Sequence, residues 1–424
     1  MLSREENELI TRVGAGTPMG ELMRCYWIPA LLAQEISDPD CPPVRVRLLG
    51  EDLVAFRNSQ GRVGLLHEHC SHRGTSLFYG RNEECGLRCI YHGWKYDIEG
   101  NVLETPAEPA GSTLKFKVRH TAYPCKEAAG IVFTYMGPKE RVPFFPNYEW
   151  TTLPPDHLYV TKSIQDCNYL QGLEGECDSS HLSFLHRAFT ENKRGGGDPD
   201  MYGRDRAPKL EGVETDFGVR MISCRNGGDG LTYLRVSNFV MPCHGFVPTG
   251  GLKGNPEGYT VHSHVPLDDE HSLRFNIFFR RNREVTEEEK KLDGDIGPDH
   301  IKVRNIRNNY LQDREEQRRE TFTGMGKNFV IHDSCATESM GPIFDRSKEH
   351  LGAGDITMIA VRKFLLQCVR ALDRGKEPPH VIRTQQQNDL RHIACIVTKM
   401  DSSIDPKKHI AKLLKKEKYW EPAS

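Results

Sequence analysis

The sequence lacks several features that would define broad functional classes. No run approaches the roughly eighteen consecutive apolar residues of a membrane span, and the start, MLSREENELI, lacks the apolar core of a secretion signal. Neither sign of charge predominates, because 57 Lys and Arg face 59 Asp and Glu for a formal net charge of -2, and no basic domain stands out. We therefore expect a cytoplasmic protein with no membrane and no nucleic-acid partner.

The cysteines do not suggest a secreted disulfide framework. There are 13 of them, an odd number scattered over 424 residues, which is typical of a reducing compartment. The composition is that of an ordinary globular chain, with 37% hydrophobic and 27% charged residues. A chain of this length predicts two domains, or one large domain with a smaller one attached.

Two pairs of metal-ligating residues organise the first part of the chain. Cys70-Ser-His72 and Cys89-Ile-Tyr-His92 are separated by residues 73–88. One Cys and one His from each of two loops is the ligand set of a Rieske [2Fe-2S] cluster, in which one iron takes two thiolates and the other takes two imidazoles. A structural zinc site is the alternative, although zinc sites seldom combine these two spacings.

The periodicity around these pairs predicts a β domain. Alternating apolar and polar residues before Cys70, with turn signals at residues 50–52 and 58–61, indicate antiparallel hairpins. We predict N-terminal helices over residues 1–40, a Rieske domain over residues 41–150, and a catalytic domain over residues 151–424. Strand patterns return over residues 219–280, and residues 356–372 have helical apolar spacing. The expected fold class is α+β, with an antiparallel β Rieske domain and a larger domain whose antiparallel sheet is flanked by helices.

A second group of possible ligands begins the catalytic part. On a continuous helix, Glu174, Asp178 and His181 share one face at i, i+4 and i+7. His186 would lie about 140° from His181 on that helix, so both can hold one metal only if the helix ends or bulges between them. Two imidazoles and a distant carboxylate form the facial triad of non-haem Fe(II) oxygenases. The spacing leaves the carboxylate open among four residues, Asp313, Asp333, Asp345 and Asp355.

These motifs resemble those of a known family. The segment CSHRGTSLFYGRNEECGLRCIYHGWKYDIEGNVLETP is similar to the cluster-binding segment of Rieske non-haem iron oxygenases. The runs RVGAGTPMGELMRCYWIPALL and FTGMGKNFVIHDSCATESMGPIFDRSKEHLGAGDITMI resemble the phthalate 4,5-dioxygenase-like subfamily of terminal oxygenase alpha subunits. A small Rieske ferredoxin would end soon after residue 150, whereas this chain continues to Ser424.

The resemblance implies roles for individual residues. Asp333, ahead of ESMGPI, would complete the iron triad with His181 and His186. Asp178 would bridge His181 to His92 of the partner subunit, so the expected assembly is a homotrimer or a stacked hexamer. Asp178 and Glu174 are therefore the candidate catalytic residues.

The resemblance also implies the reaction. The expected function is the terminal oxygenase of a multicomponent system that uses O2 to cis-dihydroxylate or hydroxylate an aromatic acid. The chain has no Gly-rich dinucleotide fingerprint, so electrons from NADH would come through a separate reductase. Two alternatives remain: an O-demethylase of a methoxylated aromatic acid, and a Rieske electron carrier without oxygenase activity.

Binding an acid in a pocket calls for a cationic side chain. The candidates are Arg235, in the strand pattern TYLRVSNFVMP, and Arg206 with Lys209, just past a glycine-rich stretch. Each could equally be an ordinary surface or salt-bridging residue. Residues 187–209 are predicted to form a loop that either covers the substrate entrance or lies on the surface.

Overall fold

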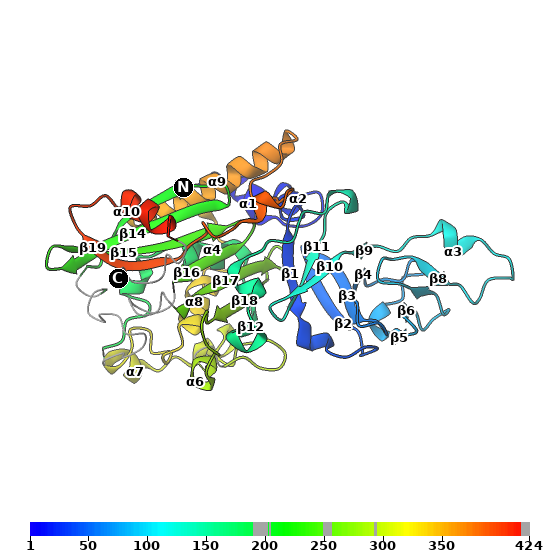
Figure 1. Ribbon diagram of the computed structural model, residues 1–424. Helices are drawn as coiled ribbons and strands as arrows, with labels where there is room; N and C mark the ends of the chain where they lie inside the picture. The colour runs from blue at the N-terminus through cyan, green and yellow to red at the C-terminus, as the bar shows by residue number, and fades with distance from the viewer. Residues whose placement is uncertain (190–201, 203–204, 249–256, 292–294, 417–424) are drawn as a thin grey trace.

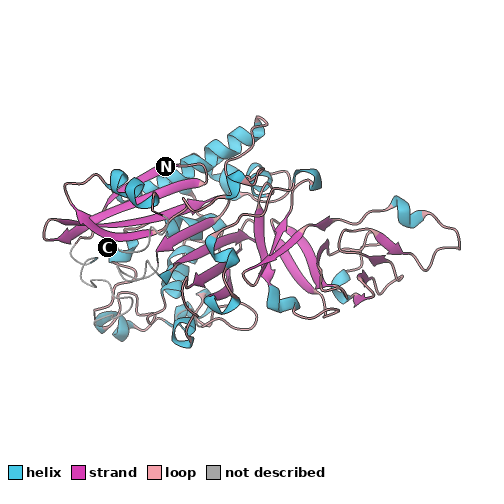
Figure 2. Cartoon of the chain, in the orientation of Figure 1, coloured by secondary structure: helices cyan, strands magenta, loops and turns pink. Residues whose placement is uncertain are grey.

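The molecule consists of two parts of unequal size. The computed structural model describes residues 1–189, 202, 205–248, 257–291 and 295–416. A larger part built on one broad sheet lies beside a smaller part made of short strands, which gives an elongated shape (Figure 1). Helices gather in the larger part, while the smaller part is almost entirely strand and loop (Figure 2). The predicted α+β class is confirmed.

The larger part contains an eight-stranded sheet in which all pairings are antiparallel. Its strands follow the order β12-β18-β17-β16-β15-β14-β13, and β19 pairs with β15. The predicted strands over residues 219–280 form as part of this sheet. The strands are β12 (Leu158–Gln165), β13 (Lys209–Glu214), β14 (Gly218–Gly228), β15 (Leu231–Val240), β16 (His244–Pro248), β17 (Tyr259–Pro266), β18 (Ser272–Phe279) and β19 (Ile396–Asp401).

The two faces of this sheet have different coverings. On one face Ile222, Leu234 and Ile396 pack against Ile410 of α10 (Pro406–Leu414). The other face is covered by α9 (Ile356–Asp373), which approaches so closely that a Cβ added to Gly212 would lie 2.5 Å from Ala360. Successive side chains of a strand point to opposite faces of the sheet, so alternate residues of these strands face α9 and α10.

Most of the remaining helices lie around the same sheet, whereas the short helix α3 lies in the smaller part (Figure 1). The helix predicted over residues 356–372 forms as α9, and α4 packs beside it against β15, β16 and β17. The other helices, in chain order, are α1 (Arg4–Thr11), α2 (Pro18–Met23), α3 (Leu114–Lys117), α4 (Tyr169–Cys177), α6 (Glu287–Lys290), α7 (Arg314–Arg319) and α8 (Phe329–Glu338).

The N-terminal residues 1–40 differ from the prediction of helices alone. Helices α1 and α2 form and pack on α9, and the capping box of Ser3 and Glu6 is present. The next segment is a strand, β1 (Trp27–Leu32), which pairs with β11 (Ile131–Tyr135) of the smaller part. Its apolar run WIPALL is buried throughout, and Pro29 is accommodated where the register shifts.

The smaller part consists of three small antiparallel sheets. The proline-rich residues 142–155, which the sequence predicts to be the linker, contain only short 3-10 turns, and Phe144 N–H donates to the carbonyl of Ile382 at 2.9 Å. The linker is thus fixed against the C-terminal region. The strands are β2 (Val44–Leu48), β3 (Glu51–Arg57), β4 (Val63–His67), β5 (Arg81–Glu83), β6 (Gly86–Arg88), β7 (Lys95–Tyr96), β8 (Val102–Glu104), β9 (Ala122–Tyr123) and β10 (Cys125–Ala128).

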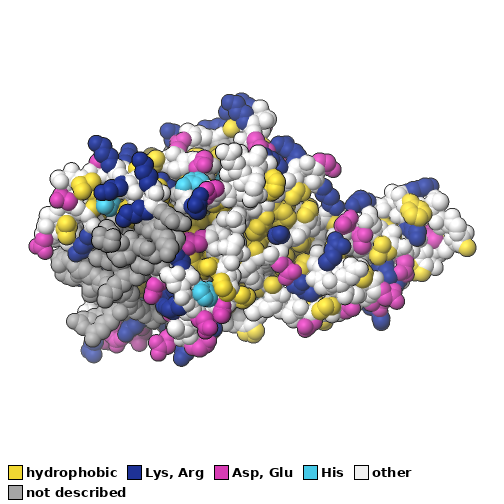
Figure 3. Space-filling model, in the orientation of Figure 1, with side chains coloured by type: hydrophobic (Ala, Val, Ile, Leu, Met, Phe, Trp, Pro, Cys, Tyr) yellow, Lys and Arg dark blue, Asp and Glu magenta, His cyan; other side chains and the backbone are white. Residues whose placement is uncertain are grey.

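The surface and the helices agree with the charge and hydropathy of the sequence. Basic and acidic side chains are interspersed over the visible face (Figure 3). In the described part of the chain, no helix has both the length and the apolar character needed to cross a bilayer. Of the predicted loop over residues 187–209, residues 190–201 and 203–204 lie outside the described residues.

Candidate metal centres

The two loops that carry the Cys and His pairs have the same backbone pattern. Gly74 N–H donates to the carbonyl of Cys70 at 2.8 Å, and Gly93 N–H donates to that of Cys89 at 3.0 Å. Both glycines have positive φ, +77° and +74°, a conformation that other residues adopt only with strain. Each loop therefore turns tightly after its His and presents the pair on one side.

The four side chains of these loops converge at one end of the smaller part. The rings of His72 and His92 have centroids 4.5 Å apart, and Trp94 stacks on His72 at 4.7 Å. Cys70 and Cys89 are buried, and the Tyr96 hydroxyl lies 3.0 Å from Cys70 Sγ. Burial raises the pKa of the Cys89 thiol, and the neighbouring Cys70 adds to this effect. Two thiolates at this place therefore need a cationic group between them.

The spread of these ligands fits a cluster better than a single ion. In the described residues, only His181, His186 and Asp333 bring three such ligand atoms within 4.8 Å of one another. No three of the ligand atoms of Cys70, His72, Cys89 and His92 lie that close to one another. A tetrahedral zinc ion holds its ligands at about 2.0–2.3 Å, whereas a Rieske cluster takes two thiolates at one iron and two imidazoles at the other. The donor set and its spacing thus fit a [2Fe-2S] cluster.

The second centre depends on where α4 ends. The helix stops at Cys177, Asp178 is extended (φ -98°, ψ 122°), and His181 begins a separate 3-10 turn, His181–Ser183. The expectation that Glu174, Asp178 and His181 share one helix face is therefore wrong. His181 and His186 can hold one metal only if helical geometry ends between them. This condition is met, because Phe184 leaves helical geometry (φ -127°, ψ -67°).

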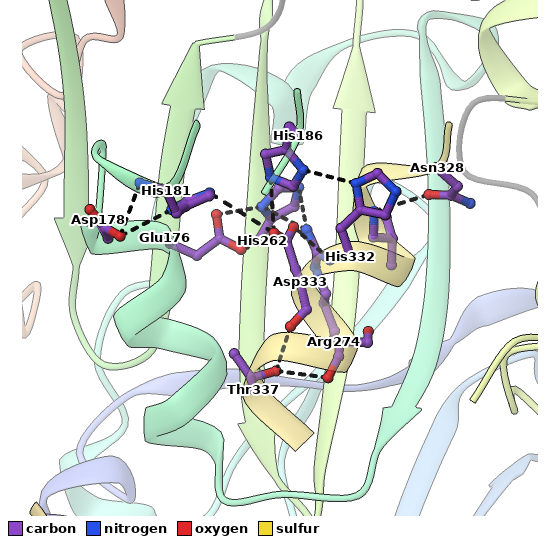
Figure 4. A network of polar contacts seen from close by, with 12 residues as sticks. Glu176, Asp178, His181, His186, His262, Arg274, Asn328, His332, Asp333 and Thr337 are labelled. Atoms are coloured by element: carbon purple, nitrogen blue, oxygen red, sulfur yellow. Dashed lines mark hydrogen bonds and ion pairs between the residues drawn. The ribbon is translucent and has the colours of Figure 1, made fainter. Parts of the chain in front are cut away.

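Three side chains from distant parts of the chain meet at this second centre. Asp333 of α8 places Oδ1 3.0 Å from His186 Nε2 and 3.9 Å from His181 Nε2 (Figure 4). Two imidazoles and one carboxylate on one side of a metal position are the donor set of the facial triad, which leaves other coordination positions open. The chemistry of these donors fits a mononuclear iron.

The electrostatics of this position favour a bound cation. Burial by itself raises the pKa of Asp333, but His186, Arg274 and His181 outweigh it and lower the pKa to about 2. Burial lowers the pKa of His181, yet Asp178 and Asp333 reverse the effect and raise it. Asp333 is therefore ionised at neutral pH, and the surrounding carboxylates attract positive charge to the imidazoles.

The spacing also allowed three other aspartates as the third metal ligand, but each of them accepts hydrogen bonds from nearby backbone N–H groups. Asp313 accepts hydrogen bonds from Glu315 N–H and Glu316 N–H at the start of α7. Asp345 caps a 3-10 turn through Ser347 N–H, and Asp355 accepts from Gly352 N–H. The geometry thus favours Asp333.

Asp178 is held beside His181 by its own loop. Its Oδ1 accepts from Ser180 N–H at 2.6 Å, and its Oδ2 accepts from His181 N–H at 3.2 Å and lies 3.4 Å from His181 Nδ1. Burial raises the pKa of Asp178, but His181 and these backbone N–H groups outweigh it and lower the pKa. Asp178 is thus a carboxylate that fixes the orientation of His181.

A fully buried arginine anchors the same loop to the sheet. Arg225 of β14 donates to the Ser179 carbonyl at 2.6 Å and to the Ser179 and Ser223 hydroxyls at 3.1 Å each. Because Ser179 follows Asp178 directly, the position of Asp178 is tied to β14 as well as to α4.

Glu174 lies in a structural ion cluster rather than beside the iron position. Its carboxylate accepts from Arg346 at 2.8 and 2.9 Å and from Arg362 at 2.5 Å, and both guanidiniums are buried. Burial raises the pKa of Glu174, but the two arginines outweigh it and lower the pKa. The placement corrects the expectation that it shares a helix face with Asp178 and His181.

Glu176, which no sequence motif singles out, lies at the centre of a second cluster of polar side chains. Its buried carboxylate lies 2.8 Å from His262 Nδ1, 3.2 Å from His264 Nε2 and 3.6 Å from Arg274 Nη2. Arg274 Nη1 in turn lies 3.8 Å from Asp333 Oδ2. His262 and His264 share one face of β17, and the tertiary fold brings Glu176 to both of them. Figure 4 shows Glu176 beside His262.

The three cationic candidates for substrate binding lie in different places. Arg235 of β15 is half-buried and sits opposite Ser223 on the face that carries the Asp178 loop. Arg206 is exposed, with its guanidinium 5.9 Å from the ring centroid of Phe184. Lys209 of β13 is exposed and sits opposite Cys224 on the α10 face, away from the face that carries Arg235.

Comparison with known proteins identifies the domain families that contain the two candidate metal centres. Residues 26–124 match the Rieske [2Fe-2S] domain family, and residues 134–418 match the family described as LigXa C-terminal domain like. The oxygenase subunit of phthalate 4,5-dioxygenase from Pseudomonas putida is 40% identical over 395 residues, covering 89% of this chain and 88% of that protein.

The chain belongs to the Rieske non-haem iron oxygenases. A second relative is the oxygenase subunit of 5,5'-dehydrodivanillate O-demethylase from a Sphingobium species, 32% identical with 90% of this chain and 84% of that protein covered. Among solved structures, the oxygenase in the oxygenase–ferredoxin complex of carbazole 1,9a-dioxygenase has the same fold, with a TM-score of 0.57, 17% identity and coverage of 92% and 98%.

Membership of this family settles several alternatives. The protein is an enzyme, the terminal oxygenase component of a Rieske system, and its cofactors are a [2Fe-2S] cluster and a mononuclear iron. The zinc alternative and the electron carrier without oxygenase activity are therefore set aside.

The position of Glu174 leads to a stability prediction. Replacing it in Glu174→Ala leaves two buried arginines without this carboxylate, so we expect the free energy of unfolding to fall by about 3–5 kcal/mol. Urea unfolding measures this change. The iron content of the folded variant should equal that of the wild type, and Glu174→Gln should lose less stability. Loss of iron at unchanged stability would instead make Glu174 part of the metal site.

Proposed function

We propose that this oxygenase uses O2 and two electrons to hydroxylate or cis-dihydroxylate an aromatic acid of the phthalate type. The observation that supports the proposal is the convergence of ligand atoms of His181, His186 and Asp333 within 4.8 Å. A half-buried arginine, Arg235, lies opposite Ser223 on the sheet face that contacts the loop of Asp178. The activity named for the phthalate 4,5-dioxygenase relative supports this class of substrate. O-demethylation of a methoxylated aromatic acid is the second candidate, supported by the O-demethylase relative.

We assign the metal ligands residue by residue. Cys70 and Cys89 would hold one iron of the cluster, and His72 and His92 the other. His181, His186 and Asp333 would hold the mononuclear iron. When bound, these groups supply electron transfer and the activation of dioxygen.

Asp178 is proposed as the link between the two kinds of centre. A buried carboxylate can accept hydrogen bonds from an imidazole at each end, and Asp178 already lies 3.4 Å from His181 Nδ1. Its second imidazole would be His92 of the partner subunit in a homotrimer or a stacked hexamer. Ile90 and Tyr91, next to His92, are 58% and 55% exposed, which suits a surface that another subunit covers.

The electrons would come from separate proteins. The carbazole neighbour is recorded in complex with a ferredoxin, and we expect this chain likewise to accept electrons from a ferredoxin or an NADH-dependent reductase. All 13 cysteines are free, which fits a cytoplasmic location.

Arg235 is the proposed anchor for the substrate carboxylate. In the described residues its guanidinium has no hydrogen-bond or ion-pair partner, whereas the donors of its neighbour Arg225 are occupied by Ser179, Ser223 and the Asp205 carbonyl. A half-buried guanidinium can bind a carboxylate with two parallel hydrogen bonds. Binding the acid there would place its ring on the face that carries the Asp178 loop.

The function is tested by turnover with a panel of aromatic acids and a generic reductase. We expect a hydroxylated or dihydroxylated product by mass from at least one acid, and formaldehyde only if the second candidate is correct. Asp333→Ala should lose the mononuclear iron and the product while keeping the Rieske signal in electron paramagnetic resonance. A variant that retains its iron would remove Asp333 from the ligand set.

The bridging role of Asp178 predicts a separation of binding from turnover. Asp178→Asn keeps the size of the side chain but removes the charge, so both metals should remain bound while turnover falls by about 10- to 100-fold or more. Iron analysis and product formation measure the two effects. Full activity in this variant would count against the bridge.

The role of Arg235 predicts a change confined to acids. Arg235→Ala should raise KM for aromatic acids by about 10-fold or more and leave KM for neutral analogues unchanged, because the lost interaction is charge-assisted. Lys209→Ala, on the opposite face of the same sheet, is the matched control and should change neither constant. An equal rise for acids and neutral analogues would indicate a loss of shape instead.

A further inference from the structure

His332 is a buried residue next to the proposed ligand Asp333, and no sequence motif assigns it a role. It lies in α8 with 2% of its surface exposed. Its Nδ1 lies 3.3 Å from Nδ1 of His186 (Figure 4). Its Nε2 lies 3.0 Å from the carbonyl oxygen of Gly326. The ring therefore spans the space between a proposed iron ligand and the backbone.

The carbonyl of Gly326 decides which nitrogen of His332 carries a proton. A carbonyl oxygen can only accept, so Nε2 of His332 must donate. In neutral His332 the other nitrogen, Nδ1, then has a free lone pair. That lone pair points at His186 Nδ1 and can accept its proton.

The same logic fixes the tautomer of His186. With the proton on Nδ1, Nε2 of His186 has a free lone pair, and Nε2 is the atom that lies 3.0 Å from Asp333 Oδ1. A metal between these side chains requires that lone pair. The donor and acceptor assignments from the Gly326 carbonyl through His332 to His186 are therefore compatible with one another.

The backbone around Gly326 is built to present this carbonyl. Gly326 has φ +78°, a conformation that suits glycine, and its N–H donates to Glu316 Oε1 at 2.8 Å. Glu316 Oε1 also accepts from the Thr321 hydroxyl at 2.7 Å. On the ligand side, the ring of Phe329 stacks on His186 with centroids 4.3 Å apart. Both ends of the series are therefore held in place.

We infer that His332 is a positioning residue that fixes the Nδ1–H tautomer and the ring orientation of His186, so that Nε2 faces the mononuclear iron. The inference rests on the proposed role of His186 as an iron ligand. It also gives the two histidine ligands unlike supports, since His181 is oriented by the anionic Asp178 and His186 by a neutral imidazole. His186 would accordingly be the less electron-rich ligand of the two.

The test compares substitutions that keep or remove the hydrogen bonds. Glutamine in His332→Gln can accept from His186 through its carbonyl and donate to Gly326 through its amide, whereas His332→Leu can do neither. We expect His332→Leu to lower the affinity of metal-depleted full-length protein for Fe2+ by about 10- to 100-fold. We expect it also to change the visible spectrum of the Co2+-substituted centre. His332→Gln should restore affinity and spectrum toward the wild type.

Three controls separate the possible results. The Rieske signal and the Tm show whether each variant folds, and His332→Met replaces the leucine variant if that one does not. His380→Leu removes a half-buried histidine whose Nε2 lies 2.7 Å from the Tyr148 hydroxyl, and should leave metal affinity unchanged. His186→Ala tests the ligand itself.

The outcomes distinguish this inference from the proposed function. Wild-type metal affinity in His186→Ala would overturn the assignment of His186 as a ligand, and this inference with it. Loss of metal in His186→Ala together with wild-type affinity and spectrum in His332→Leu would overturn the inference alone. Equal losses in His332→Gln and His332→Leu would also overturn it, because packing rather than hydrogen bonding would then be responsible.

Discussion

The architecture of the catalytic part depends on bringing one carboxylate of α8 to two imidazoles that follow α4. Asp333 lies 3.0 Å from His186 and 3.9 Å from His181, although the residues come from elements far apart in the chain. Their approach requires that α4 end at Cys177, since a continuous helix would direct the two histidines about 140° apart. The extended residue Asp178 and the short 3-10 turn after it make both histidines face α8.

Holding these groups together in a buried place has an electrostatic cost, which the surrounding ion clusters offset. Glu174 is paired with Arg346 and Arg362, and Glu176 lies between two histidines and Arg274. Both glutamates belong to α4, the helix that leads into the ligand loop. A buried carboxylate is tolerated only when charge partners and hydrogen bonds replace the lost water. The two clusters therefore fix α4 against α9 and against the sheet.

The supports of the individual ligands form a connected set. Arg225 holds the loop of Asp178, Asp178 orients His181, and Arg274 connects the Glu176 cluster to Asp333. His186 is supported from the other side by His332 and the carbonyl of Gly326. Each ligand thus has a neighbour that restricts its rotation, which lowers the conformational cost of binding a metal. The chemistry of the site depends on these supports as much as on the ligands themselves.

Local spacing in the sequence was sufficient for part of this description. The pairs Cys70/His72 and Cys89/His92, the histidines at 181 and 186, the strands over residues 219–280 and the helix over residues 356–372 all follow from patterns within a few turns of chain. Resemblance to a family selected Asp333 from four aspartates that spacing left equivalent. Tertiary structure was needed for the rest, because contacts between distant elements leave no periodic trace. Only the fold separates Glu174, bound by two arginines, from Glu176, which contacts two histidines and Arg274. Only the fold also directs Lys209 and Arg235 to opposite faces of one sheet and brings His332 to His186. The physical reason is that residue type and spacing determine which atoms can act as ligands, whereas long-range packing determines which of them meet.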